Sequence, residues 1–165
     1  MLQRKKDEVL LQDVQSAINE QKAGPYDFQS KMTTVKAGEY DSIGVLSIPV
    51  LNLELPVLTD WSYTKLKKAP CHYYGSYYEK DFVIAAHNYE SHFGELSELQ
   101  DDDIVIFTDA SVTVHYYEVI LLETLPDDAT KEMITSGFDL SLYTCTPGGS
   151  NRVTVRCNAA QDSNR

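Results

Sequence analysis

The sequence predicts a mainly β protein, a closed barrel of seven or eight short strands with a few short helices. Most apolar stretches are short and bounded by turn residues, and several alternate apolar with polar residues as half-buried strands do. Only one long stretch has a helical period. A chain of 165 residues has the size of one domain and can bury a full core. Many short strands with regular turns favour a closed or nearly closed barrel.

The N-terminal 41 residues differ from the rest of the chain. Residues 5–21 form a predicted amphipathic helix, because three apolar residues recur at every fourth position: Leu10, Val14 and Ile18. Gly24 and Pro25 end this helix, and residues 26–41 are polar, lack a period and are expected to be extended. We therefore expect two parts, a helix with a linker over residues 1–41 and a β-barrel domain over residues 42–165.

The pattern changes at residue 42, where the barrel is expected to begin. Strands are predicted at these segments: 43–49 (IGVLSIP), 53–57 (LELPV), 71–78, 81–87 (DFVIAAH), 101–108, 112–124, 140–145 and 152–157. Residues 81–87 are nearly all apolar, which is typical of a central strand. Short helical segments are predicted at 58–68, 89–99 and 130–135. In the first of these Thr59 or Asp60 is the expected N-cap, and Pro70 stops the helix.

The charge balance excludes several functions. The net charge is −11, whereas nucleic-acid-binding domains carry a basic surface and anionic membranes attract basic segments. The sequence has no run of about 18 or more apolar residues, and its N-terminus lacks the apolar core of a signal peptide. We therefore expect no nucleic-acid partner.

Residues 140–158 (LSLYTCTPGGSNRVTVRCN) contain the first candidate site. Side chains alternate between the two faces of a strand, so Cys145 and Arg152 both turn away from the apolar faces of their strands. Those apolar faces carry Leu140, Leu142, Val153 and Val155. If the apolar faces line the core, a thiol and a guanidinium meet on the accessible side at one end of the sheet. This position departs from the buried packing role that is usual for cysteine.

The other two cysteines show no metal or redox spacing. Cys157 shares a face with Val153 and Val155, so we expect it to pack in the core. Cys71 is not assigned by its surroundings, and a disulfide between Cys71 and Cys157 stays open.

Histidines supply candidate proton carriers. His87 ends an apolar strand, where a ring can project from a rigid support, although a structural histidine is an equally good interpretation. His115 lies in an alternating strand and is expected at the surface or a groove rim, while His72 and His92 have no identifiable partner. The acidic residues 101–103 suggest calcium, but they lack the spacing of an EF-hand loop, so a solvated turn is expected.

Taken together, His87, Cys145 and Arg152 resemble the active-site pattern of the sortases, the transpeptidases of Gram-positive cell surfaces. The family signature is a strand ending T-L-x-T-C, followed by a loop and an arginine that opens the last strand. Residues 141–145 read SLYTC, with Ser141 in place of Thr, and Arg152 opens the sequence RVTVR.

Two further motifs resemble the same family. Residues 83–89 (VIAAHNY) are similar to the strand that carries the family's histidine, with Ala86 where a glycine is common. Residues 43–49 are similar to its opening strand, I-G-x-(I/L)-x-I-P. The motifs occur in the family's order, and the resemblance covers roughly residues 42–158. It implies the sortase type of closed β-barrel.

The resemblance implies cysteine transpeptidation without a metal or an organic cofactor. Cys145 attacks the Thr–Gly carbonyl of an LPxTG-like sorting signal and forms a thioester, helped by neighbouring cations that favour a thiolate. His87 protonates the departing amine and then deprotonates the incoming one, and Arg152 binds the developing oxyanion or the substrate backbone. Three further residues are expected to bind substrate or support this machinery: Thr144, Asn88 and Tyr143.

The resemblance also implies partners and a location. The donors are surface proteins with a sorting signal, and the acceptor is an amine on a peptidoglycan precursor or a pilin lysine. The enzyme is expected on the extracellular face of the cell membrane, anchored by a segment outside this sequence. The TCTPGG link and the short connection 126–139 resemble classes C and D, whereas the N-terminal helix and residues 87–96 (HNYESHFGEL) resemble class B, so the subclass stays open.

Two other functions compete with this interpretation. A hydrolytic cysteine protease of the papain type places its cysteine before its histidine, the reverse of the order here, and the caspase motif QACxG is absent. A non-catalytic surface β-barrel that serves as a binding module predicts an inert Cys145.

Overall fold

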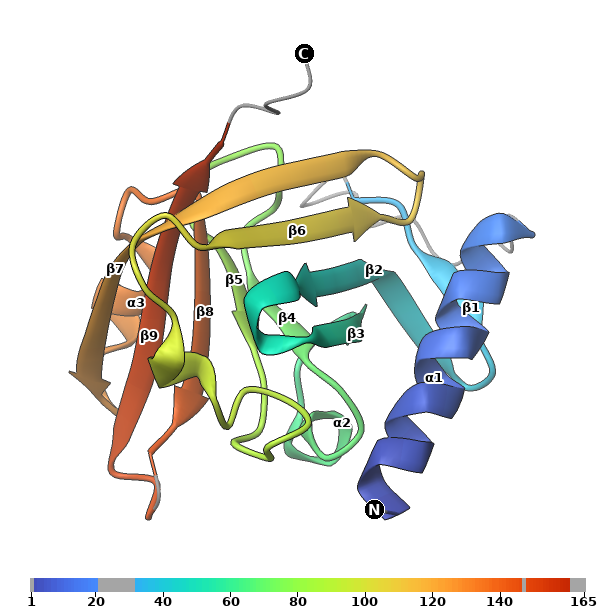
Figure 1. Cartoon of the computed structure of the whole chain (residues 1–165), viewed down its shortest axis with the longest axis horizontal. Coiled ribbons are helices and arrows are strands. Elements are labelled where there is room, and N and C mark those ends of the chain that lie inside the picture. Colours follow the sequence, from blue (N-terminus) through green and yellow to red (C-terminus); the bar gives the residue numbers. More distant parts are fainter. Residues whose placement is uncertain (1, 21–31, 147, 161–165) are drawn as a thin grey trace.

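The computed structural model describes residues 2–20, 32–146 and 148–160, and it shows one sheet of nine strands rolled into a barrel (Figure 1). The strands follow the order β1-β2-β3-β4-β5-β8-β9-β7-β6, and β2 also pairs with β6. This additional pairing closes a ring of eight strands and leaves β1 outside it. The predicted fold class, a mainly β closed barrel with few helices, is confirmed.

Each segment predicted as a strand contains one. The strands are β1 Val35–Ala37, β2 Tyr40–Ile48, β3 Leu53–Leu58, β4 Cys71–Tyr74, β5 Phe82–Ala85, β6 Ile104–Asp109, β7 Val114–Pro126, β8 Leu140–Cys145 and β9 Asn151–Ala159. The helices are α1 Leu2–Asn19, η1 Pro49–Leu51, α2 Tyr63–Leu66, η2 Leu96–Glu98 and α3 Thr130–Ile134. Strand β1 was not predicted, and it forms because Val35 and Ala37 bury their side chains beside β2. The predicted stop at Gly24 and Pro25 lies outside the described residues.

The predicted helix over residues 58–68 was too long, and its N-cap was wrong. Leu58 ends β3, and Asp60 has a positive φ of 42°, so the chain turns before the helix begins. Ser62 caps the four-residue helix α2, because its extended backbone lets the side-chain oxygen accept the Lys65 N–H at 3.1 Å. The helix therefore starts late and presents exposed aromatic residues near its first turn.

The ring encloses the main core, and α1 packs against its outside. Phe82, Phe107 and Leu142 are fully buried inside the barrel. A second cluster joins Val14 and Ile18 of α1 to apolar residues of β1 and β2, with Leu10 partly buried beside it, so the predicted helical stripe is confirmed. Figure 1 shows α1 lying along one side of the barrel, next to β1. Among the described residues, no helix has both the length and the apolar content that a membrane crossing requires.

A glycine permits the closure of the ring between β2 and β6. Gly44 pairs with Asp109 of β6 and has a φ of 149°. A Cβ atom at this position would overlap the Thr108 carbonyl oxygen, so any larger residue forces the two strands apart. The glycine of the motif IGVLSIP is therefore required by packing.

Candidate active site

Three neighbouring strands, β5, β8 and β9, bring the predicted site residues to one end of the barrel. Strands β5 and β8 are parallel, and the register that pairs Ala85 with Tyr143 places His87 level with Cys145, two residues further along each chain segment. Strands β8 and β9 are antiparallel and pair Cys145 directly with Arg152. The sheet register therefore groups the thiol, the imidazole and the guanidinium, although their residues are far apart in the sequence.

The three side chains line one cavity, with a volume of about 380 Å³. Five of the six predicted site residues line it: His87, Asn88, Tyr143, Cys145 and Arg152. Strand β5 contributes Ala85 to the lining, and the segment that leads into and through α3 contributes Ala129 and Met133. The cavity is thus apolar along the strands, with its reactive groups at the end where β5 and β8 stop.

The His87 ring is half-buried and stacks on Tyr89, with ring centroids 3.9 Å apart. Its Nδ1 atom is buried and has no hydrogen-bond partner in the described residues. Burial lowers the pKa of His87 below its usual 6.5, and the nearby His92 and Lys67 lower it further, while the Asn88 side chain acts in the opposite direction. The neutral ring is therefore favoured at neutral pH.

The Arg152 guanidinium is partly buried and points over the turn between β8 and β9. Its Nη1 atom donates to the Gly149 carbonyl at 3.2 Å and to the Asn151 carbonyl at 3.3 Å. Both acceptors belong to neutral backbone groups, so the positive charge of Arg152 has no carboxylate partner among the described residues. A guanidinium has five N–H donors, and the remaining ones are available to a ligand in the cavity.

An aromatic row leads away from the reactive groups. Tyr143 contacts Tyr73 edge-on at a centroid distance of 5.3 Å, Tyr73 contacts Trp61 at 5.7 Å, and Trp61 contacts Tyr63 at 5.2 Å. Burial raises the pKa of Tyr143, helped by Tyr73 and Cys145 and opposed by Arg152, so this phenol stays neutral. All four rings line the cavity. Sequence reasoning missed Trp61 and Tyr63, although Trp61 is the chain's single tryptophan.

A family model, described as the sortase domain, matches residues 46–160. The chain belongs to the sortase family. Among solved structures, it is similar to sortase C1 of Streptococcus agalactiae, with 25% identity, 74% of this chain and 69% of that chain covered, and a TM-score of 0.64. A lid mutant of sortase A from Corynebacterium diphtheriae matches with 21% identity, 98% and 97% coverage and a TM-score of 0.66. No curated protein gives a significant match.

A class D relative matches the fold over almost the whole chain. The sortase D5 transpeptidase of Clostridium perfringens has 15% identity, with 95% of this chain and 99% of that chain covered and a TM-score of 0.71. Sortases are cysteine transpeptidases of the cell surface, so this chain is an enzyme of that type. The named structures belong to classes A, C and D, and the subclass of this sortase stays a prediction.

Thr144 is separated from the sortase cavity by strand alternation. Its side chain faces the barrel interior, is 4% exposed and does not line the cavity. Its hydroxyl has no hydrogen-bond partner in the described residues, so no hydrogen bond links it to the reactive groups.

Arg156 lies on the same face of β9 as Arg152, but it is buried. Its side chain donates to Glu123 and Ser141 at 2.8 Å each, and to the Glu132 and Met133 carbonyls at 2.8 and 3.1 Å. Helix α3 covers this part of the sheet, which leaves Arg156 only 1% exposed and Ser141 fully buried. Arg156 therefore fastens to the sheet the helix that lines part of the cavity.

The other two cysteines are free and buried, so no disulfide joins Cys71 to Cys157. Burial raises the pKa of both thiols to about 12, which keeps them protonated and unreactive. The packing role predicted for Cys157 is confirmed.

The remaining histidines lie outside the cavity. His115 pairs with the buried Asp109 at 2.8 Å. The Nε2 atom of His72, whose partner could not be identified from the sequence, lies 2.6 Å from the Gly75 carbonyl oxygen. His92 is fully buried. Within the described residues, no group of three or more histidine, cysteine or acidic side chains forms a metal site.

Proposed function

We propose that this sortase cleaves an LPxTG-like sorting signal through a thioester on Cys145 and transfers the acyl group to an amine. The observation that carries the proposal is the placement of Cys145, His87 and Arg152 on three adjacent strands around one cavity. Such a set supplies the three functions that acyl transfer needs: a nucleophile, a proton carrier and a donor to the oxyanion.

Cys145 is the nucleophile in this proposal. Its thiolate attacks the carbonyl carbon between Thr and Gly, and a C–S bond forms as the carbonyl oxygen becomes an oxyanion. Collapse of this intermediate breaks the C–N bond, and the departing amine takes a proton from His87. A second amine then attacks the thioester, gives a proton back to His87 and releases Cys145 as a thiolate.

The lowered pKa of His87 limits how many molecules are ready to react. Burial and the neighbouring His92 and Lys67 favour the neutral ring, yet the first step needs the imidazolium as general acid. At neutral pH the protonated form of His87 is therefore the minor one.

Arg152 is the oxyanion donor or the clamp on the substrate backbone. Its two hydrogen bonds to turn carbonyls hold the guanidinium in place before substrate arrives, which avoids the cost of reorganising it during the reaction. Cross-strand pairing puts it directly beside Cys145, where negative charge develops. Asn88 and Tyr143 line the same cavity and are proposed to contact the substrate.

The cavity lining fits the apolar half of a sorting signal. Leu66, Ala86 and Met133 offer apolar surface, and Trp61 and Tyr73 add aromatic rings suited to leucine and proline. Leucine and proline stand on the acyl side of the cleaved bond, so we place that side in the cavity and the departing glycine outside it.

The remaining parts of the proposal concern context. We propose an acceptor amine on a peptidoglycan precursor or a pilin lysine, and action at the outer face of the cell membrane with an anchor outside this sequence. We also propose that residues 1–41 are an attachment to a catalytic domain of residues 42–165. The start of the family match at residue 46 and the packing of α1 on the outside of the barrel support that division.

The test is cleavage of an LPxTG peptide with and without a glycine oligomer, followed by mass spectrometry. We expect the transfer product when the oligomer is present and a thioester mass on Cys145 when it is not. Cys145→Ala abolishes both, whereas Cys157→Ala, a matched control with a buried thiol, keeps the activity of its folded fraction.

The same assay separates the competing functions. Hydrolysis at an unchanged rate with no transfer product indicates a protease. A Cys145 that neither cleaves the peptide nor reacts with iodoacetamide under mild conditions indicates a binding module. Cleavage that depends on Cys157 contradicts the proposed nucleophile.

A further inference from the structure

A second cavity extends the first along the outside of the barrel. It has a volume of about 890 Å³, and Trp61 and Tyr73 line both cavities. Its lining includes Asp81, which directly precedes β5, and Gly137, which lies shortly before β8. Cys145 ends β8. The two cavities therefore form one groove that follows β5 and β8 from their ends back to their beginnings.

The length of the groove sets which part of a substrate reaches the second cavity. Leu140 and Cys145 are the two ends of β8, so the strand between them spans about 17 Å at roughly 3.3 Å per residue. An extended peptide has the same rise, and the four residues Leu-Pro-x-Thr cover about 13 Å of it. With the threonine carbonyl at Cys145, the residues that precede the leucine extend into the second cavity.

The charges of the second cavity are mostly engaged, except for two carboxylates. Asp81 accepts hydrogen bonds from Ser136 and the Gly137 N–H, and Lys80 pairs with Asp139 at 3.2 Å. The side chains of Asp60 and Glu79 are exposed and form no hydrogen bond or ion pair within the described residues. The groove thus contains two carboxylates without an ion-pair partner in the described residues, although the Lys65 ammonium binds the Asp60 backbone carbonyl at 3.2 Å.

Aromatic rings line the same cavity as these carboxylates. Trp61 and Tyr74 line the second cavity, with exposed fractions of 38% and 45%. The face of an indole or phenol ring attracts a cation, and carboxylates nearby add to that attraction. A lysine or arginine side chain meets both features, whereas an acidic side chain is repelled by one and gains nothing from the other.

We propose that this second cavity binds a positively charged side chain roughly one to three residues N-terminal to the leucine of the sorting signal. Asp60 and Glu79 attract the charge, and Trp61 and Tyr74 contact it with their ring faces. The proposal rests on the acyl side of the substrate lying in the first cavity, as proposed above. It makes the cavity a specificity site of the enzyme, separate from the reacting groups.

The experiment compares two LPxTG peptides that differ only at the two positions before the leucine, Lys-Lys in one and Glu-Glu in the other. We expect a kcat/KM roughly five- to tenfold higher for the lysine peptide, carried by KM, as weak exposed charge pairs and cation–π contacts allow. The preference shrinks at 0.5 M salt, a concentration at which exposed charges are screened over about 4 Å.

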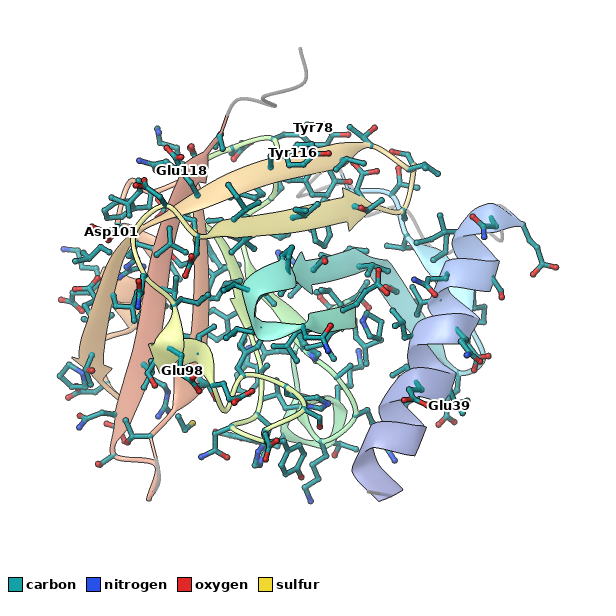
Figure 2. All side chains as sticks on the ribbon, viewed as in Figure 1. Glu39, Tyr78, Glu98, Asp101, Tyr116 and Glu118 are labelled. Atoms are coloured by element: carbon teal, nitrogen blue, oxygen red, sulfur yellow. The ribbon has the colours of Figure 1, made fainter. Side chains whose placement is uncertain are left out.

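The double variant Asp60→Asn/Glu79→Gln tests the residues. Asparagine suits the positive φ of residue 60, so the turn is kept. The control Glu54→Gln/Glu98→Gln removes the same charge from exposed residues that line neither cavity (Glu98 is labelled in Figure 2). We expect the first variant to cleave both peptides equally well and the control to keep the wild-type preference.

Each other outcome has a defined meaning. Equal kcat/KM for both peptides with the wild type, or an equal loss of preference in both double variants, overturns the proposal. A variant that forms the thioester normally but transfers it more slowly to the amine also overturns it, because the cavity then serves the acceptor. Failure of the wild type to cleave either peptide contradicts the proposed function instead.

Discussion

Two arginines on the same face of β9 have opposite surroundings. Arg156 is 1% exposed and donates to a carboxylate, a hydroxyl and two backbone carbonyls. Arg152 lies four residues earlier in β9, at the rim of the cavity. It donates to two carbonyls of the turn between β8 and β9. One guanidinium uses its donors within the protein, and the other keeps several for a ligand.

The two residues have the same side chain, so their surroundings, not their type, show that one supports the fold and the other serves the reaction. A buried charge is costly unless hydrogen bonds compensate it, and the four partners of Arg156 do so. Arg152 keeps contact with solvent and carries its charge next to the position where an oxyanion forms. Arg152, with unused donors at a cavity rim, is therefore suited to bind a ligand. Arg156, whose donors are bound within the protein, is suited to hold the fold together.

The largest expected effect follows the loss of the buried arginine. Arg156→Ala leaves Glu123, Ser141 and two α3 carbonyls without their donor, so we expect the free energy of unfolding to fall by about 3–5 kcal/mol. Urea unfolding followed by fluorescence measures this loss. A loss below about 1 kcal/mol contradicts the view that Arg156 fastens α3 to the sheet.

The arginine at the cavity rim, Arg152, is expected to affect catalysis and leave stability nearly unchanged. Arg152→Ala changes the free energy of unfolding by less than about 1 kcal/mol, because only bonds to its own turn are lost. The same change lowers kcat/KM for an LPxTG peptide by roughly a hundredfold, as the removal of an oxyanion donor does. Kinetics per folded molecule, compared with Arg156→Lys, separates the two roles. Equal losses for both variants remove the distinction.

The smallest expected effect concerns the pKa of His87, the second group of the site that can carry a positive charge. Arg152 is charged at all working pH values, whereas burial lowers the pKa of His87 below 6.5. An NMR titration of the His87 ring is expected to show a midpoint below 6.5, and Tyr89→Ala, which removes the stacked ring, moves that midpoint upward. A midpoint at or above 6.5 in the unchanged protein shows that burial does not control this ring.

The same shift links His87 to stability. Because the folded pKa is lowered, the unfolded chain binds more protons between the two pKa values. This residue therefore contributes no penalty above pH 6.5, and it destabilises the fold progressively as the pH falls below that value.

The sequence predicted the parts that depend on local alternation. The opposite faces of Leu142 and Cys145, the central strand before His87 and the pairing of the last two strands all follow from a period of two residues. The many short strands favoured a barrel, the family motifs then indicated its sortase type, and the family match agrees with them. The grouping of His87, Cys145 and Arg152 was predicted from these two sources together.

The sequence did not predict features that depend on contacts between distant segments. Ser141 and Arg156 share a polar face with exposed residues, and only the packing of α3 buries them. Trp61 joins the cavity because Ser62 delays the helix and the chain turns at Asp60. The acidic residues did not indicate a site in the sequence, and they do not gather in one place: Glu39 and Glu118, for example, lie far apart (Figure 2).

The ring of strands is held unevenly, and its weakest seam lies between β3 and β4. These parallel strands share one paired position, Leu58 with Cys71, and two further backbone bonds cross the seam nearby. Strands β7 and β9, in contrast, pair along most of their length. Amide hydrogens beside the seam are therefore expected to exchange with solvent early. Trp61 and Tyr73 flank this seam, so the aromatic side of the groove can open locally while the hydrogen bonds between the other strands stay intact.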